Sequence, residues 1–143
     1  MKKGSNIKLF RQIEHTGDIG IEIDAGTRAE LFRRAAIAIA QIMVEPTNIR
    51  TATTRRLLIE GTRDEDLMHD MLSALLQLFL VEGFIWSDAT VEEREEGIII
   101  AVSGENFDPQ RHEFHEEIKA VTYHQLTVHK TGEGWHARVI FDV

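Results

Sequence analysis

The stretch EHTGDIGIEI, residues 14–23, marks the boundary between two runs in which apolar and polar side chains alternate. Alternation with a period of two is typical of β-strands that bury one face. The pattern predicts strands over Ile7–His15 and Ile19–Ala25. A histidine, a threonine, a glycine and an aspartate therefore gather at the point where the second strand begins.

Two helices are predicted downstream. Thr27 and Glu30 form a capping box ahead of apolar residues at helical spacing, which predicts a helix as far as about Met43. Asp64 is the expected N-cap of a second helix that ends near Gly83. The latter half of this second helix is apolar on nearly every side, so we expect it to be the buried spine of the fold.

The other segments with strand character are joined mainly by hairpins, and they cover residues 49–60, 84–93, 98–103, 121–129 and 135–141. Gly97 can supply the left-handed conformation that the bend before residue 98 requires. Because strands outnumber helices, we expect an α+β fold with two principal helices packed on a mainly antiparallel sheet. The 143 residues, 43% of them hydrophobic, are predicted to form one domain over 1–143.

The composition excludes several classes of function. The chain has no cysteine, so disulfides, thiolate zinc sites and cysteine nucleophiles are excluded. Its 24 acidic and 16 basic residues give a formal charge of −8, which opposes broad adhesion to nucleic acid. No secretory signal is recognisable, and the most apolar window is far shorter than the ~20 residues that span a bilayer. These features indicate a cytoplasmic protein without membrane contact.

Two short motifs are better explained by local structure than by chemistry. GEGWHA, residues 132–137, has the form of a dinucleotide fingerprint, but a strand follows it where that fingerprint requires a helix. HEFH, residues 112–115, is one residue short of the spacing that aims two helical histidines at one zinc ion. We therefore interpret HEFH as a polar loop.

Asp18 and Asp142 are the candidate site residues. An aspartate at a strand entrance is commonly a turn residue that accepts hydrogen bonds from nearby amides, and this interpretation of Asp18 stays open. In the sharper interpretation, the strands that carry Asp18 and Asp142 meet, and the carboxylate of Val143 adds further oxygens. Oxygen donors favour a hard cation, so calcium, magnesium or manganese is expected instead of sulfur-bound zinc.

Three stretches together resemble the archease family: EHTGDIGIEI, then FDPQRHEFHEEIKAVTYH at residues 107–124, then the closing RVIFDV. The resemblance covers nearly the whole chain, and the motifs occur in the family's order. It implies an α+β fold with an SHS2-type module. It also implies an accessory factor for tRNA splicing that is not itself an enzyme. Such a factor assists an RtcB-type RNA ligase by promoting guanylylation of the ligase's own histidine with GTP and divalent metal, which sustains multiple turnover.

The resemblance also assigns roles to single positions. The metal-binding aspartates of the family fall on Asp18 and Asp142, Val143 completes the site, and calcium is the ion first expected in it. HTGD stands where the family more commonly shows HTAD, so Gly17 replaces an alanine without removing a ligand. The lysine of the family's IKAVTYH motif falls on Lys119, a candidate contact for ligase activation. An exposed lysine within a solvated charge cluster is the alternative.

Four further expectations concern the neighbourhood of this site, the alternative functions and contact with RNA. His15 is a candidate for supporting the metal ligands from just outside the coordination sphere. A stand-alone metal-dependent phosphohydrolase, with His15 or His124 as the base, is the alternative function. An interaction or chaperone module, whose acidic residues serve only solubility, is another. For a ligase helper, contact with RNA is expected to be indirect.

Overall fold

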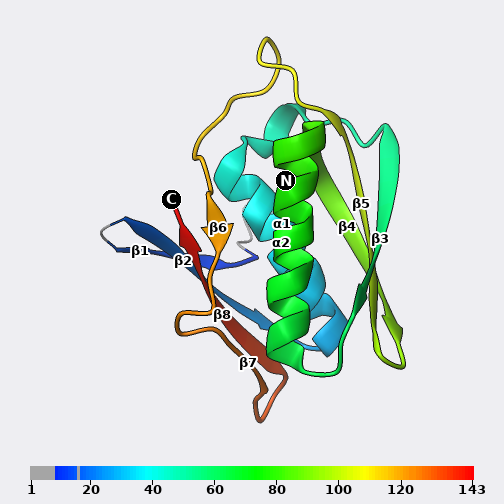
Figure 1. The fold of residues 1–143 in the computed structure, drawn as a ribbon, viewed down its shortest axis with the longest axis vertical. Coiled ribbons are helices and arrows are strands. Elements are labelled where there is room, and N and C mark those ends of the chain that lie inside the picture. The colour runs from blue at the N-terminus through cyan, green and yellow to red at the C-terminus, as the bar shows by residue number, and fades with distance from the viewer. Residues whose placement is uncertain (1–8, 16) are drawn as a thin grey trace, which may run out of the picture.

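Two antiparallel sheets enclose two helices in the computed structural model, which describes residues 9–15 and 17–143 (Figure 1). The helices are α1 (Arg28–Met43) and α2 (Asp64–Glu82). The strands are β1 (Arg11–His15), β2 (Asp18–Ala25), β3 (Thr53–Glu60), β4 (Phe84–Arg94), β5 (Gly97–Asn106), β6 (Ala120–Val121), β7 (Thr127–Lys130) and β8 (Trp135–Asp142). A short 3-10 helix, Pro46–Asn48, follows α1.

One sheet contains five strands and the other three. The larger has the order β1-β2-β8-β6, with β7 also paired to β8, and the smaller has the order β3-β5-β4. In Figure 1 the blue strand β2 runs beside the red strand β8, so an early strand and the last strand are neighbours. The predicted α+β class with two principal helices is confirmed, and its strands are divided between two sheets.

The core lies between the sheets and surrounds the helices. The isoleucines of β2 alternate as the sequence predicts, and Ile21 and Ile23 are at most 1% exposed. Trp86 of β4 is completely buried, and its indole N–H donates a 2.8 Å hydrogen bond to the carbonyl of Ala36 in α1. This bond satisfies the polar atom of the ring inside the core. It also ties the smaller sheet to α1.

The start of α1 confirms one half of the predicted capping box. The Thr27 hydroxyl accepts a hydrogen bond of 3.1 Å from the amide of Glu30. The Glu30 carboxylate pairs with Arg33 and Arg34 at 3.0 and 2.9 Å. Glu30 therefore stabilises the helix through side chains three and four residues later.

The ends of α2 differ in how well the sequence predicts them. Asp64 is the first residue of the helix, not its cap, and Arg63 in the cap position makes no capping hydrogen bond with its side chain. The Asp64 carboxylate lies 2.7 Å from a guanidinium nitrogen of Arg28 and so links the two helices. Gly83 ends α2 with a left-handed φ of 70°, as predicted.

Three predicted strands are shorter than expected. The strand predicted from residue 49 begins at Thr53, because the amide of Arg50 bonds to the Glu105 side chain instead of joining a ladder. The strand predicted over 121–129 is interrupted between β6 and β7, where Gln125 has a φ of 54°. Of the first predicted strand, residues 7 and 8 lie outside the described part of the chain, and Leu9 and Phe10 form a bend before β1 begins at Arg11.

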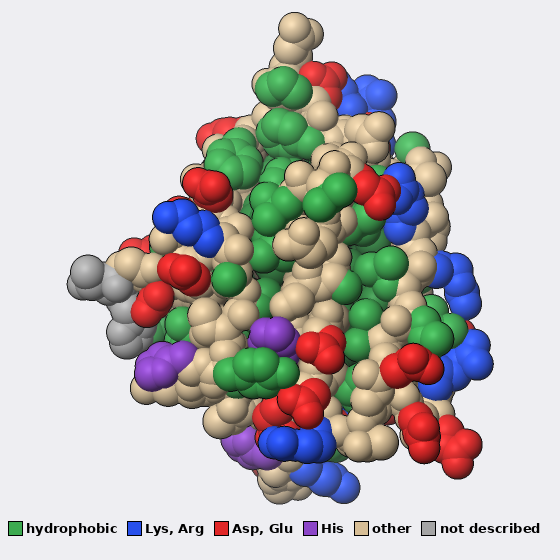
Figure 2. Space-filling view, viewed as in Figure 1, with side chains coloured by type: hydrophobic (Ala, Val, Ile, Leu, Met, Phe, Trp, Pro, Cys, Tyr) green, Lys and Arg blue, Asp and Glu red, His purple; other side chains and the backbone are tan. Residues whose placement is uncertain are grey.

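The face presented by α2 has no continuous charged surface. Figure 2 shows hydrophobic side chains along the middle of this face, with acidic and basic side chains mixed around its rim. Neither helix of the described residues is long and apolar enough to cross a membrane.

Candidate functional site

Strands β2 and β8 bring Asp18 and Asp142 opposite each other. The two residues are paired in the antiparallel register, with Ile19 opposite Phe141 as the next pair. Side chains of directly opposite residues project from the same face, with Cβ atoms about 4.5–5.5 Å apart. The meeting of strands that the metal hypothesis required is therefore present. We call Asp18 and Asp142 the acidic pair.

Three segments of main chain meet at the acidic pair. The amide of Lys119 donates a 2.7 Å hydrogen bond to the carbonyl of Asp142, and Ala120 pairs with Asp142 in β6. The amide of Val143 donates a 3.4 Å bond to the carbonyl of Gly17. Lys119 and Val143, both singled out from the sequence, thus lie beside the pair. The Lys119 side chain is exposed.

Gly17 shapes the entrance to β2. Its φ is 77°, in the left-handed region that favours glycine, and no atom lies within 4 Å of where a Cβ would be. The glycine is therefore needed for conformation and not for space. Gly17 lies in the turn between β1 and β2, which are paired with His15 opposite Asp18. Its left-handed conformation therefore sets the turn that leads into Asp18.

An apolar row separates the acidic pair from the basic residues on the same sheet face. A Cβ on Gly20 would lie 2.8 Å from Cδ1 of Ile140, which is 3% exposed and covers the glycine. One step further along the strands, Arg11 and Arg138 both pair with Glu22, Arg138 at 2.8 Å. The single Glu22 carboxylate thus offsets part of the positive charge of these two arginines. The acidic pair is left to attract another cation.

The donor set at the acidic pair suits a hard divalent ion. Among residues 9–15 and 17–143, no three His, Asp or Glu side chains converge so as to hold a metal. The side chains therefore supply two carboxylates, and the remaining donors would be main-chain oxygens, such as that of Val143, and water. Calcium and magnesium accept this mixture of ligands. Asp142 is exposed and Asp18 is half-buried, so the site is open to solvent.

His15 and His124, the two candidate bases of the alternative phosphohydrolase, occupy different places relative to the acidic pair. His15 is opposite Asp18 in the backbone register, but its side chain is outside what the structure describes. His124 is exposed, and its amide bonds to the Thr122 hydroxyl at 3.2 Å in the segment between β6 and β7.

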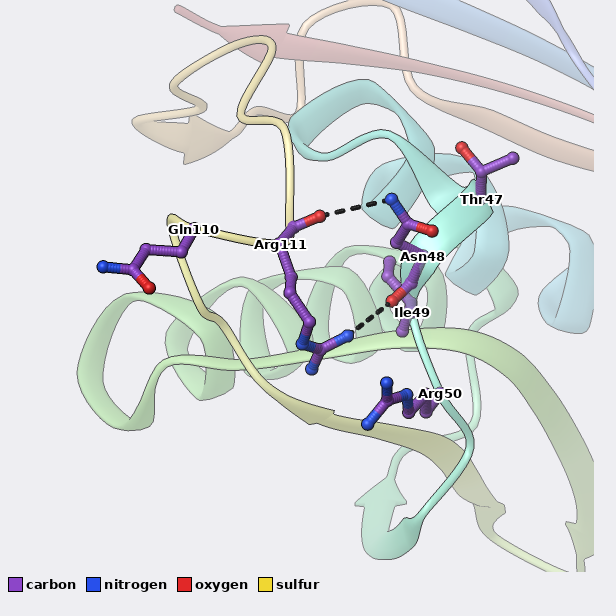
Figure 3. A pocket seen from close by; sticks show the side chains of 6 residues that line it. All are labelled: Thr47, Asn48, Ile49, Arg50, Gln110 and Arg111. Atoms are coloured by element: carbon purple, nitrogen blue, oxygen red, sulfur yellow. Dashed lines mark hydrogen bonds between the residues drawn. The ribbon is translucent and has the colours of Figure 1, made fainter.

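A separate hollow of about 420 Å³ lies between the 3-10 helix and the turn that follows β5 (Figure 3). Its lining residues are Thr47, Asn48, Ile49, Arg50, Gln110 and Arg111. Figure 3 shows Arg111 reaching across to Asn48, whose carbonyl accepts a 3.1 Å hydrogen bond from Nη1. The Asn48 amide in turn donates to the carbonyl of Arg111 at 3.3 Å. These paired bonds clamp two loops together.

Glu105 organises this clamp. Its carboxylate accepts hydrogen bonds from Arg111 at 2.7 Å, from the amide of Arg50 at 2.9 Å and from Nε2 of His112 at 2.9 Å. The Arg111 bond, followed by the Arg50 amide, lowers the pKa of Glu105 to about 2. The side chain of Arg111 also lies 3.7 Å from Asp108. Carboxylates therefore balance the charge of Arg111, and its bonds make this side of the hollow a structural junction.

His112 was expected in a polar loop but is buried, at 4% exposure. Nδ1 of His112 accepts a hydrogen bond of 2.8 Å from the amide of Asp108. The proton of the imidazole ring therefore resides on Nε2 and points to Glu105. The other histidine of HEFH, His115, is exposed and lies 3.2 Å from Glu45. Sequence spacing could not reveal this burial, since the partner Glu105 belongs to β5.

Glu105→Gln is expected to lower the free energy of unfolding by about 1–2 kcal/mol at pH 7, because charged hydrogen bonds are replaced by neutral ones. The pKa of Glu105 falls from 4.5 to about 2 on folding, so its stabilisation is complete above about pH 4.5 and is lost as the pH falls to about 2. Urea unfolding from pH 7 to pH 2 should show the two proteins converging at the acid end. Glu95→Gln, in an exposed turn, is the matched control. A difference that stays constant with pH would contradict this role.

Sequence comparison identifies one family over almost the whole chain. The profile described as "Archease protein family (MTH1598/TM1083)" matches residues 10–143. "Protein archease" of Methanosarcina acetivorans is 38% identical over 141 residues, which cover 95% of this chain and 97% of the relative. "Protein archease" of Pyrococcus abyssi is 32% identical over 142 residues, covering 96% of this chain and 100% of the relative.

Solved structures agree with the fold. The solution structure of Methanobacterium thermoautotrophicum protein 1598 superposes with a TM-score of 0.77 at 26% identity, covering 96% of this chain and 100% of that one. The crystal structure of TM1083 from Thermotoga maritima, described as an archease and possible chaperone, gives a TM-score of 0.67 at 23% identity. That match covers 93% of this chain and 96% of the other.

Proposed function

Because the chain belongs to the archease family, we propose that it activates an RtcB-type RNA ligase in tRNA splicing. In this proposal the protein promotes the GTP-dependent guanylylation of the ligase and keeps it turning over, without catalysing ligation itself. The observation that carries the proposal is the register of β2 and β8, which sets Asp18 opposite Asp142. Two carboxylates that have no ion-pair partner among the described side chains, at a solvent-open strand junction, are a means of holding a cation at a surface that a partner can reach.

In the proposed mechanism, Asp18 and Asp142 hold a divalent cation together with a main-chain oxygen of Val143. We expect calcium first, with magnesium or manganese as substitutes, because carboxylate and carbonyl oxygens are hard ligands. A bound cation supplies neutralisation of triphosphate charge, which is the main requirement of nucleotidyl transfer. The chain's own task is placement: its paired strands fix the two carboxylates before the partner arrives.

Lys119 is proposed as a contact with the ligase or with the phosphates of its nucleotide. Its amide is bonded to the carbonyl of Asp142, so the side chain starts directly beside the acidic pair. An ammonium group next to a site that handles phosphate can share in binding the same charge. His15, whose backbone is paired with Asp18, is proposed as a residue that supports the metal ligands.

The proposal assigns RNA recognition to the ligase. The chain carries a formal charge of −8, and the face in Figure 2 mixes both signs of charge instead of offering a basic track. Both features oppose attraction to a polyphosphate backbone. We therefore expect indirect contact with RNA, in the cytoplasm.

The test is ligation of RNA ends under conditions in which the ligase is limiting. With GTP and divalent metal, product should exceed one equivalent of ligase only when this protein is present. Product that stays at or below one equivalent in its presence would overturn the proposal. The same preparation, incubated alone with phosphoesters and metal, is expected to release no phosphate. Hydrolysis that disappears in Asp18→Asn would instead establish a phosphohydrolase.

A further inference from the structure

Two histidines and an aspartate lie in a row across β2, β8 and β7. His136 of β8 is paired with Asp24 on one side and with His129 on the other. Directly opposite residues share a sheet face, so all three side chains project together. Asp24 is six residues from Asp18 along β2, which corresponds to about 20 Å of strand. The row is therefore separate from the acidic pair.

The two imidazole rings are spaced as two ligands of one metal ion would be. Their centroids are 5.5 Å apart and their planes are inclined by 44°. With metal–nitrogen bonds of about 2.0–2.1 Å, each ring centre lies about 3.2 Å from a shared ion, and a tetrahedral angle then separates the centres by about 5.2 Å. The observed separation of His129 and His136 is within a few tenths of an ångström of that value.

Asp24 prepares His136 for this role. Nδ1 of His136 lies 2.9 Å from a carboxylate oxygen of Asp24, and an ionised carboxylate can only accept, so the ring proton resides on Nδ1. Nε2 is then left with a free lone pair. A carboxylate behind a histidine fixes the tautomer and raises the basicity of the ligating nitrogen. His136 remains accessible, with 24% of its side chain exposed, and His129 is exposed.

We propose that His129 and His136 bind a transition-metal ion that prefers imidazole, namely Zn²⁺, Ni²⁺ or Cu²⁺, with Asp24 as the positioning residue. Since no third His, Asp or Glu among the described residues converges on the rings, water completes the coordination. Nitrogen ligands distinguish this site from the acidic pair, whose oxygen donors select hard ions. Binding would also join β7 to β8 and thereby stabilise the hairpin that they form.

The test is calorimetric titration of the full chain with Ni²⁺ or Zn²⁺ in the presence of millimolar Ca²⁺, which occupies the acidic pair. One equivalent should bind to the wild type. His129→Gln and His136→Gln should each weaken binding at least tenfold, and Asp24→Asn should weaken it about tenfold. His124→Gln is the control for an exposed histidine, and Asp18→Asn is the control for the other site; neither should change the affinity.

A second measurement guards against variants that merely fold poorly. Without metal, the circular dichroism and the midpoint of thermal unfolding should be the same in His129→Gln and in the wild type. With metal, the midpoint should rise in the wild type only. The proposal is overturned if both histidine variants bind like the wild type, or if Asp18→Asn abolishes binding. Either result can be obtained whether or not the chain stimulates a ligase.

Discussion

Gly104→Ala is expected to destabilise the folded chain strongly. A Cβ at this position in β5 would overlap the carbonyl oxygen of Ile85 and would lie 2.5 Å from Cα of Trp86. Both obstacles are main-chain atoms of the paired strand β4, so no change of rotamer can relieve the overlap. The strands would have to separate where β4 carries a bulge and where Trp86 enters the core. We expect a loss of about 4 kcal/mol or more, which is a large part of the stability of a domain of this size.

Urea unfolding followed by tryptophan fluorescence and circular dichroism measures this loss. Gly132→Ala is the matched control, because a Cβ on Gly132 meets no atom within 4 Å and its φ is not positive. That variant should unfold within about 0.5 kcal/mol of the wild type. If Gly104→Ala and Gly132→Ala have the same unfolding midpoint, the close approach of β4 to β5 is wrong.

Gly104 illustrates which features of the fold a sequence reveals. Thr27 and Gly83 act on their own helix ends, so local patterns predicted both correctly. Gly97 was predicted from its turn and has a positive φ of 151°, but a Cβ there would also overlap the carbonyl oxygen of Ile59 in β3, which no local pattern reveals. The need for glycine at position 104 arises from a bulge between Trp86 and Asp88 in another strand. No pattern around residue 104 contains that information, and the predicted strand ended before it.

The candidate site likewise combines features that the local sequence predicts with features that depend on a distant part of the chain. The alternation in EHTGDIGIEI correctly placed Asp18 at a strand entrance, but its partner lies 124 positions away in the chain. The meeting of the two strands was a hypothesis from the residues that no local pattern could establish, and the family resemblance supported it by assigning both aspartates to one metal site. The histidine pair was missed although its signal was local. His129 and His136 are equally distant from the turn of residues 131–134, so a simple hairpin register sets them opposite each other.

Asp18→Asn and Asp142→Asn are each expected to abolish stimulation of the ligase beyond one turnover, if the acidic pair holds the cation as proposed. Asparagine keeps the shape of the side chain but removes the negative charge that attracts the ion. The effect on folding should have the opposite sign. Like charges directly opposite in a sheet destabilise it, so each variant should be more stable without metal by about 0.2–1 kcal/mol. Loss of activity together with a small gain in stability cannot come from general damage to the fold.

Thermal unfolding with and without Ca²⁺ connects the two effects. In the wild type, the ion should raise the unfolding midpoint, because it binds the folded chain and relieves the repulsion between Asp18 and Asp142. In either variant the rise should be absent. Glu95→Gln removes one negative charge from an exposed turn, so it controls for net charge and should behave as the wild type in both assays. If the variants lose the response to Ca²⁺ yet still stimulate the ligase, the acidic pair binds metal without using it in activation. The partner-contacting role would then fall to Lys119, whose main chain is bonded to Asp142.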